Sequence, residues 1–250
     1  MFSLLMVACV VSGPGSDDTG PEGTGDTRPS DTGSPAPEVL RLPVQLSLPL
    51  VERELFETLV GVDHDPVVQD EGVLGQAICL DYLGRGFPHC YDEHGGNDYI
   101  LRGGFDQMDA GSARVVAAAD GVVLEAVDGN YDRCHGDLES GGVDCDGFEM
   151  VSNSVVVQHQ GADGSAWRTL YWHLKRDSVR VEAGQEVVRG QELGLVGSSG
   201  KSSMPHLHFE LRREQGEDEP LTVNPYAGPY SQEETGWCDQ GLEGQLPGDC

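Results

Sequence analysis

The sequence predicts a mainly β protein, an antiparallel sheet or sandwich with few short helices. Short apolar segments follow one another between glycines, and no long helical period appears. Residues 154–159 and 167–174 flank Gly161-Ala162-Asp163-Gly164, which favours a β-hairpin. Many short strands with glycine turns are typical of antiparallel β architectures.

Further elements are expected on both sides of that hairpin. Residues 115–118 and 122–127 flank Asp120-Gly121, a second hairpin signal. Strand-like segments follow at 179–181, 186–188 and 191–196. Nearer the N-terminus, the apolar patches 40–51 and 55–62 predict a strand and a short helix packed on the main domain.

Composition limits the classes of partner. The chain has 250 residues, enough for one good-sized domain and a tail. Its net charge is −28, from 43 acidic and 15 basic residues. A nucleic-acid-binding protein needs a basic patch, so that class is excluded, and anionic membrane surfaces are disfavoured for the same reason. The acidity favours solubility, or, as an alternative, attraction to cationic groups on a substrate.

The N-terminal residues suggest export. Residues 1–11 resemble the end of a lipoprotein signal, because the apolar run Ser3–Ala8 ends in a small residue before Cys9. This resemblance predicts a lipid anchor at Cys9. No basic residue precedes the run, so one alternative is a true start upstream of Met1, and another is a frayed apolar N-terminus. Residues 12–38 are rich in Gly, Asp, Thr, Pro and Ser, which predicts a disordered tether.

Six further cysteines fall into three local pairs. Six cysteines allow 15 connectivities, and pairing by proximity along the chain suggests Cys79–Cys90, Cys134–Cys145 and Cys238–Cys250. Disulfides form in oxidising compartments, so the sequence predicts an exported protein of the cell envelope.

Two histidines near the C-terminus point to a metal. In Pro205-His206-Leu207-His208-Phe209-Glu210-Leu211, polar and apolar residues alternate as in a half-buried strand. His206 and His208 then share one face, and Leu207, Phe209 and Leu211 share the other. Two imidazoles on the open face of a rigid strand suit zinc better than a core.

Other segments offer further ligands. His94 and Asp98 are separated by Gly95-Gly96-Asn97, and in an extended segment they share a face. Two imidazoles and one carboxylate leave the fourth zinc position for water, which is typical of catalytic rather than structural sites. A further histidine, His173, lies in the strand-like stretch 169–174.

These motifs resemble peptidase family M23, the LytM/lysostaphin-like zinc metallopeptidases that cut peptidoglycan. The matching elements are His-x-Gly-x-Asp (His94, Gly96, Asp98), Tyr-x-His-Leu (Tyr171, His173, Leu174) and His-x-His (His206, His208). The connecting stretches 115–123, 153–159 and 181–200 look like the family as well. The resemblance covers residues 86–226, leaving 39–85 as an N-terminal extension and 227–250 as a cysteine-containing tail.

The resemblance implies a role for each matching position. His94, Asp98 and His208 would be the zinc ligands, and His173 and His206 would be the catalytic histidines. The implied activity is hydrolysis of peptide cross-links in peptidoglycan through a zinc-bound water. Some relatives have lost ligands and regulate other wall hydrolases, so a non-catalytic regulator or binding module is the alternative. The stretch 99–114 is longer than the family's usual connector, which leaves substrate choice open.

The acidic insertion 128–150 carries the Cys134/Cys145 pair. Its aspartates do not have the spacing of an EF-hand loop, so solvated acids on a stapled loop are favoured over a calcium site, and His135 is grouped with them. His64 is expected at a surface turn and His89 in a structural role. His159 ends a strand with ambiguous facing and is left out of the site.

Overall fold

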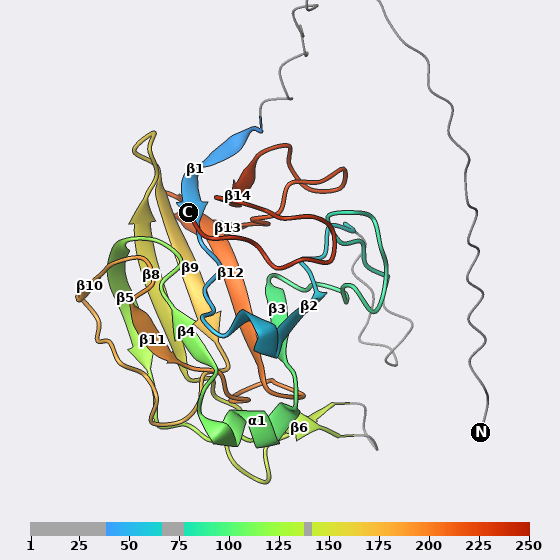
Figure 1. Cartoon of the computed structure of the whole chain (residues 1–250), viewed down its shortest axis with the longest axis vertical. Coiled ribbons are helices and arrows are strands. Elements are labelled where there is room, and N and C mark those ends of the chain that lie inside the picture. Colours follow the sequence, from blue (N-terminus) through green and yellow to red (C-terminus); the bar gives the residue numbers. More distant parts are fainter. Residues whose placement is uncertain (1–38, 67–77, 138–141) are drawn as a thin grey trace, which may run out of the picture. The chain divides into compact units, whose positions relative to one another are not determined.

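Eight antiparallel strands form the main sheet of the protein (Figure 1). The structure is a computed structural model and describes residues 39–66, 78–137 and 142–250. In spatial order the strands are β10 (Glu186–Val187), β5 (Gly121–Val127), β8 (Ser154–Gln160), β9 (Ala166–Trp172), β12 (His206–Gln215), β3 (Asn97–Leu101) and β2 (Phe56–Val60), with β13 (Asp218–Val223) also paired to β12. The predicted antiparallel β class is confirmed.

Smaller elements complete the described chain. Three two-stranded sheets pair β4 (Arg114–Val116) with β11 (Glu192–Leu195), β1 (Arg41–Leu46) with β14 (Thr235–Trp237), and β6 (His135–Gly136) with β7 (Val143–Asp144). The described residues contain one α-helix, α1 (Gly104–Ala110), and one 3-10 turn, η1 (Arg53–Leu55). Within them no helix has the length and apolar character needed to cross a membrane.

The hydrophobic core lies against one face of the main sheet. Leu207, Phe209 and Leu211 of β12 are all 0% exposed on that face, as the alternation in the sequence predicts. Residues of β1, β4, β11 and β14 belong to the same core cluster, so the β1–β14 and β4–β11 sheets cover this face. The other face of β12 carries the histidines of the His-x-His motif.

The hairpin around residues 161–164 is confirmed. β8 and β9 pair from Val155 opposite Tyr171 to Gln160 opposite Ala166. β9 also pairs along β12, which brings Trp172 opposite His208. The hairpin therefore places the Tyr-x-His-Leu segment beside the His-x-His strand.

The hairpin predicted at Asp120-Gly121 is wrong. β4 pairs with β11, whereas β5 pairs with β8 and β10. Between them the buried Ala117, Ala118 and Ala119 carry the chain from one sheet to the next. The amide of Ala117 donates to Gln191 O at 2.9 Å, so the strand partner comes from a distant segment. The Asp-Gly pair marks a crossover between sheets.

The short helix predicted within 55–62 is also wrong. After η1, residues 56–60 form β2, which pairs with β3. The apolar patch is therefore an added strand at the edge of the main sheet. The strand predicted within 40–51 is confirmed by β1.

The three disulfides Cys79–Cys90, Cys134–Cys145 and Cys238–Cys250 are formed, as pairing by proximity suggests. The last of them fixes the C-terminus near β1, where the amide of Cys250 donates to Ser47 Oγ at 3.1 Å. The predicted signal end, tether and Cys9 anchor, in residues 1–38, lie outside the described residues, as do residues 67–77 of the extension.

The long connector 99–114 and the acidic insertion meet each other. The connector contains α1, whose Asp109 carboxylate lies 2.7 Å from Arg133 Nη1. The Arg133 guanidinium also lies over the Phe105 ring, 5.0 Å from its centroid. In Figure 1, α1 and β6 lie next to each other below the main sheet. The connector and the acidic insertion are therefore in contact through Arg133.

His159, which the sequence left ambiguous, faces the interior. Its Nδ1 donates to Asp120 O at 2.8 Å, and its Nε2 lies 2.8 Å from Thr169 Oγ1. Thr169 Oγ1 in turn lies 2.9 Å from the Tyr171 hydroxyl. His159 therefore ties the crossover after β4 to β8 and β9, which is a structural role.

This burial predicts a pH-dependent stability. Burial lowers the pKa of His159, and the hydrogen bond to Asp120 only partly opposes it. As the pH falls below about 6.5, the His159 imidazole is protonated in the unfolded chain but stays neutral in the folded chain. The free energy of unfolding therefore decreases on acidification. Urea unfolding at pH 7, 6 and 5 should show a steeper loss for the parent than for His159→Gln. Equal slopes for the two chains would contradict this assignment.

Candidate metal centre

The pairing of β3 with β12 builds the centre. Asp98 lies directly opposite His208 in the antiparallel register, so the two side chains share a face. His94 precedes β3, and its Nδ1 donates to Gly61 O at 2.7 Å, which leaves Nε2 turned toward Asp98. All three residues are buried.

Three donor atoms meet closely enough to hold one metal ion. His208 Nδ1 lies 2.8 Å from Asp98 Oδ1 and 3.1 Å from His94 Nε2, and His94 Nε2 lies 3.2 Å from Asp98 Oδ1. Ligands about 2.0–2.1 Å from a tetrahedral zinc are about 3.3 Å apart, so this spacing fits that ion. His94, Asp98 and His208 form one of the two groups of metal-type side chains in the described residues.

The charges of the three residues suit a cation. Burial by itself raises the pKa of Asp98, but the imidazoles of His94 and His206 hold it well below its usual value. Burial also lowers the pKa of His208, but hydrogen bonds to Asp98 and Glu210 outweigh it and raise the pKa to about 9. Asp98 is therefore ionised, and a cation held here would take the place of the proton on His208 Nδ1.

His173 and His206 stand beside these donors. His206 Nε2 lies 3.6 Å from Asp98 Oδ1. The His173 ring lies 4.6 Å from the His206 ring and 5.8 Å from the His208 ring. All five residues predicted for the site are thus brought together, from the loop before β3, from β3, from the end of β9 and from β12.

Backbone carbonyls fix the tautomers of this second pair. His173 Nδ1 donates to Ser199 O at 2.7 Å, and His206 Nδ1 donates to Met204 O at 2.7 Å. A carbonyl only accepts, so each Nδ1 carries the hydrogen and each Nε2 keeps a lone pair. Burial, together with His206 and His208, holds the pKa of His173 well below its usual value, and burial lowers the pKa of His206. Both rings are therefore neutral proton acceptors at neutral pH.

His173 also has an uncommon backbone. Its φ is 64°, in the left-handed region that few residues other than glycine adopt. The residue lies just after β9, and its carbonyl accepts from the amide of Gly197 at 3.0 Å. Strain held by surrounding contacts is typical of functional sites.

Sequence reasoning missed one side chain on the same face. Glu210 is 3% exposed, and its Oε1 lies 3.0 Å from His208 Nε2. The strand alternation that pairs His206 with His208 also predicts Glu210 on their face, so the signal was present in the sequence.

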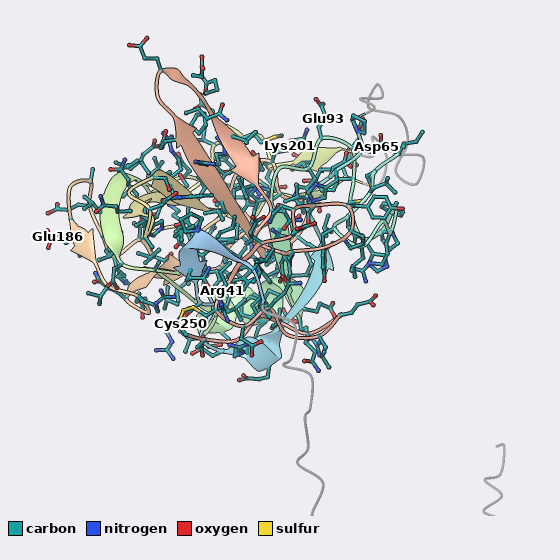
Figure 2. All side chains as sticks on the ribbon, turned by 90° about the horizontal axis from the view of Figure 1, so that it is seen from above. Arg41, Asp65, Glu93, Glu186, Lys201 and Cys250 are labelled. Carbon is teal, nitrogen blue, oxygen red and sulfur yellow. A yellow bond between two sulfur atoms is a disulfide. The ribbon has the colours of Figure 1, made fainter. Side chains whose placement is uncertain are left out.

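A groove lies beside the centre on the open face of the sheet, where the Trp172 ring stacks on the His208 ring with the centroids 5.5 Å apart. Cross-strand pairs His208–Trp172, Glu210–Leu170 and Arg212–Arg168 place these side chains on that face. The groove has a volume of about 340 Å³ and is lined by Glu125, Ser152, Ser154, Val156, Arg168, Leu170, Trp172 and Arg212. In Figure 2 the labelled Lys201, of the loop before β12, and Glu93, next to His94, lie on the same side of the molecule, away from Cys250.

The remaining histidines lie elsewhere. His64 is half-buried, and its Nε2 accepts from Asn224 Nδ2 at 2.9 Å. His135, Asp144 and Asp146 gather at the surface of the stapled insertion, with Asp144 and Asp146 exposed. His89 belongs to neither group of metal-type side chains found in the described residues.

Part of the chain matches a known protein family. Residues 102–221 match Peptidase family M23. Peptidoglycan DD-endopeptidase ShyA of Vibrio cholerae is 46% identical over 61 residues, which are 24% of this chain and 13% of ShyA. Murein hydrolase activator EnvC of Escherichia coli is 42% identical over 79 residues, or 32% of this chain and 16% of EnvC. The chain thus matches only a small part of each of these relatives.

Among solved structures, the catalytic domain of lysostaphin from Staphylococcus simulans is similar over 54% of this chain and 77% of that domain, with 25% identity and a TM-score of 0.35. The family match begins after His94 and Asp98 and contains His173, His206 and His208. Residues 102–221 of this chain therefore form a domain of Peptidase family M23.

Proposed function

We propose that this chain is a zinc-dependent endopeptidase that hydrolyses peptide cross-links of bacterial peptidoglycan. The observation that carries the proposal is the meeting of three metal-donor atoms with two neutral imidazoles on one buried sheet face. The M23 domain and relatives named as peptidoglycan DD-endopeptidases support the substrate class.

In this proposal His94, Asp98 and His208 hold the ion. Bound zinc supplies a Lewis acid for the scissile carbonyl and makes water more acidic. His173 and His206 offer bare Nε2 atoms that accept a proton during attack and return it to the leaving amine. The hydrogen bonds from Nδ1 to backbone carbonyls hold both rings in a fixed orientation during proton transfer at Nε2.

The groove supplies a binding surface for an extended peptide. Trp172, Leu170 and Val156 form an apolar part, and Ser152 and Ser154 add hydroxyl groups. Ser152 Oγ lies 3.4 Å from His173 Nδ1, so the groove adjoins the imidazole pair. A peptide in this groove would therefore lie beside the imidazole pair.

We also propose that the protein acts in the cell envelope, exported and anchored through Cys9. Three disulfides support export, because such bonds persist in oxidising compartments. Labelling with a radioactive fatty acid in a bacterial host tests the anchor, with Cys9→Ser as the unlabelled control. Equal labelling of both chains would contradict it.

Clearing of purified sacculi tests the activity. The zinc-loaded chain should lower the turbidity of the suspension, removal of metal with a chelator should stop this, and added zinc should restore it. Clearing that persists unchanged in the metal-free chain would contradict zinc dependence.

The alternative is a non-catalytic regulator of other wall hydrolases. It is favoured by the similarity to a protein named as a murein hydrolase activator. Against it, all five positions of the site carry side chains able to bind or to exchange protons. A chain that cuts no sacculi alone but speeds a second hydrolase would favour the regulator.

Gly96 is expected to control metal affinity although it is not a ligand. A Cβ at Gly96 would lie 2.6 Å from His208 Cε1 and Nε2 and 3.0 Å from Phe209 O. The sheet backbone cannot yield, so Gly96→Ala should push the His208 ring away and weaken zinc binding about 10-fold or more. Gly95→Ala is the matched control, because its nearest atoms, in Glu210, lie 3.9–4.0 Å away. Equal zinc affinities in the two variants would contradict this role.

A further inference from the structure

Glu210 is a buried carboxylate with a donor at each oxygen. Its Oε1 lies 3.0 Å from His208 Nε2, and its Oε2 accepts from Arg212 Nε at 2.6 Å. Only 4% of its side chain is exposed, so water cannot replace these partners. Both contacts come from its own strand, two residues to either side, because alternate residues of β12 share a face.

The centre requires one tautomer of His208. Its Nδ1 is the atom that faces Asp98 Oδ1 at 2.8 Å and His94 Nε2 at 3.1 Å. A metal at Nδ1 needs the lone pair there, so the ring hydrogen must sit on Nε2. His94 uses the opposite nitrogen, since its Nδ1 donates to Gly61 O. The two imidazoles therefore need opposite tautomers, and each needs its own acceptor.

We propose that Glu210 is the positioning residue that holds His208 in its metal-binding tautomer. Because Arg212 donates to the other oxygen of this side chain, we propose further that only a carboxylate at position 210 can do so. The inference rests on the proposed zinc site and concerns how that site is kept ready. Glu210 Oε1 accepts the Nε2 hydrogen of His208, which fixes the ring angle as well as the tautomer.

The role of Arg212 follows from counting donors. A glutamine at this position has one oxygen and one NH₂ group. With its oxygen toward Arg212, its NH₂ group would face His208 Nε2 and favour the tautomer that closes Nδ1 to metal. With its oxygen toward His208, its NH₂ group would face the Arg212 N–H. Two fixed donors are satisfied together only by a side chain that accepts at both ends.

This argument predicts an unusual pattern in a pair of substitutions. Glu210→Gln should weaken zinc binding about 10- to 100-fold. Arg212→Met should change it less than about threefold, because Glu210 still accepts from His208. The double variant Glu210→Gln with Arg212→Met should recover to within about fivefold of the parent, since the amide is then free to turn its oxygen to His208.

The experiment measures zinc dissociation constants by competition with a chromophoric chelator, on the full chain at one pH. Glu214→Gln is the matched control, because Glu214 is also on β12 and pairs with Arg168, outside the group of donor atoms. Its zinc affinity should equal that of the parent. Circular dichroism and thermal unfolding of each metal-free variant show whether a loss of affinity comes from unfolding.

A second readout addresses the tautomer without substitution at Glu210. Nitrogen-15 spectra of the zinc-loaded parent should show His208 with its hydrogen on Nε2 and its Nδ1 shifted by the metal. A hydrogen on Nδ1, or parent-like affinity in Glu210→Gln, would overturn the inference. A double variant as weak as Glu210→Gln alone would overturn the part assigned to Arg212. Because the readout is zinc binding, a chain that gives the full pattern but cuts no peptidoglycan refutes the proposed function and leaves this inference standing.

Discussion

Replacing His208 with alanine is expected to remove zinc binding and, with it, hydrolysis. His208 contributes the donor atom that lies within 3.1 Å of both other candidate ligands. Loss of a hydrogen-bond partner behind a ligand costs about 10- to 100-fold in affinity, so loss of the ligand itself should cost more than about 100-fold. The measurement is the zinc content of the purified variant after dialysis, together with its clearing of sacculi.

His64→Ala is the control for this experiment. Its imidazole is half-buried and bonded to Asn224, outside the group of donor atoms. It should keep one zinc per chain. Full zinc retention in His208→Ala would show that the metal is held elsewhere.

Replacing His173 or His206 with alanine is expected to give the opposite combination, with zinc kept and activity lost. Neither ring belongs to the candidate ligand group, and both present a bare Nε2 beside it. Removing a general base or acid typically costs about 10²- to 10⁴-fold in rate. Turbidity assays on sacculi at matched zinc content measure this loss.

These measurements separate the effects of a substitution on folding, on zinc binding and on the rate of hydrolysis. His159→Ala is a useful reference, since His159 is buried within the same sheet yet contacts Asp120 and Thr169 rather than the centre. It should lower stability more than rate. If His173→Ala and His206→Ala both hydrolyse as fast as the parent, the proposed mechanism is wrong.

Local patterns in the sequence were enough to predict several features. Alternation in 205–211 predicts the face shared by His206 and His208, because side chains alternate in any strand whatever its partner. The turn at 161–164 predicts the β8–β9 hairpin, because a tight turn fixes its own neighbours. Pairing by proximity predicts the disulfides, because each bond closes a short loop.

Features that depend on distant segments could not be read in the same way. Asp120-Gly121 has the composition of a hairpin turn, but β4 finds its partner in β11, more than seventy residues later. Residues 56–60 become a strand because the edge of β3 is available to them. The importance of Glu210 depends on which nitrogen of His208 faces Asp98, which only atomic coordinates give.

The most direct test of the central claim is mass spectrometry of peptidoglycan digested in water enriched in ¹⁸O. With the zinc-loaded chain, cross-linked muropeptides should fall and their separated stems should rise, with ¹⁸O in the newly formed carboxylates. The chelator-treated chain should give none of these products. Intact cross-links after treatment with a chain that holds its zinc, across peptidoglycans of different cross-link chemistry, would contradict the account and favour the regulator.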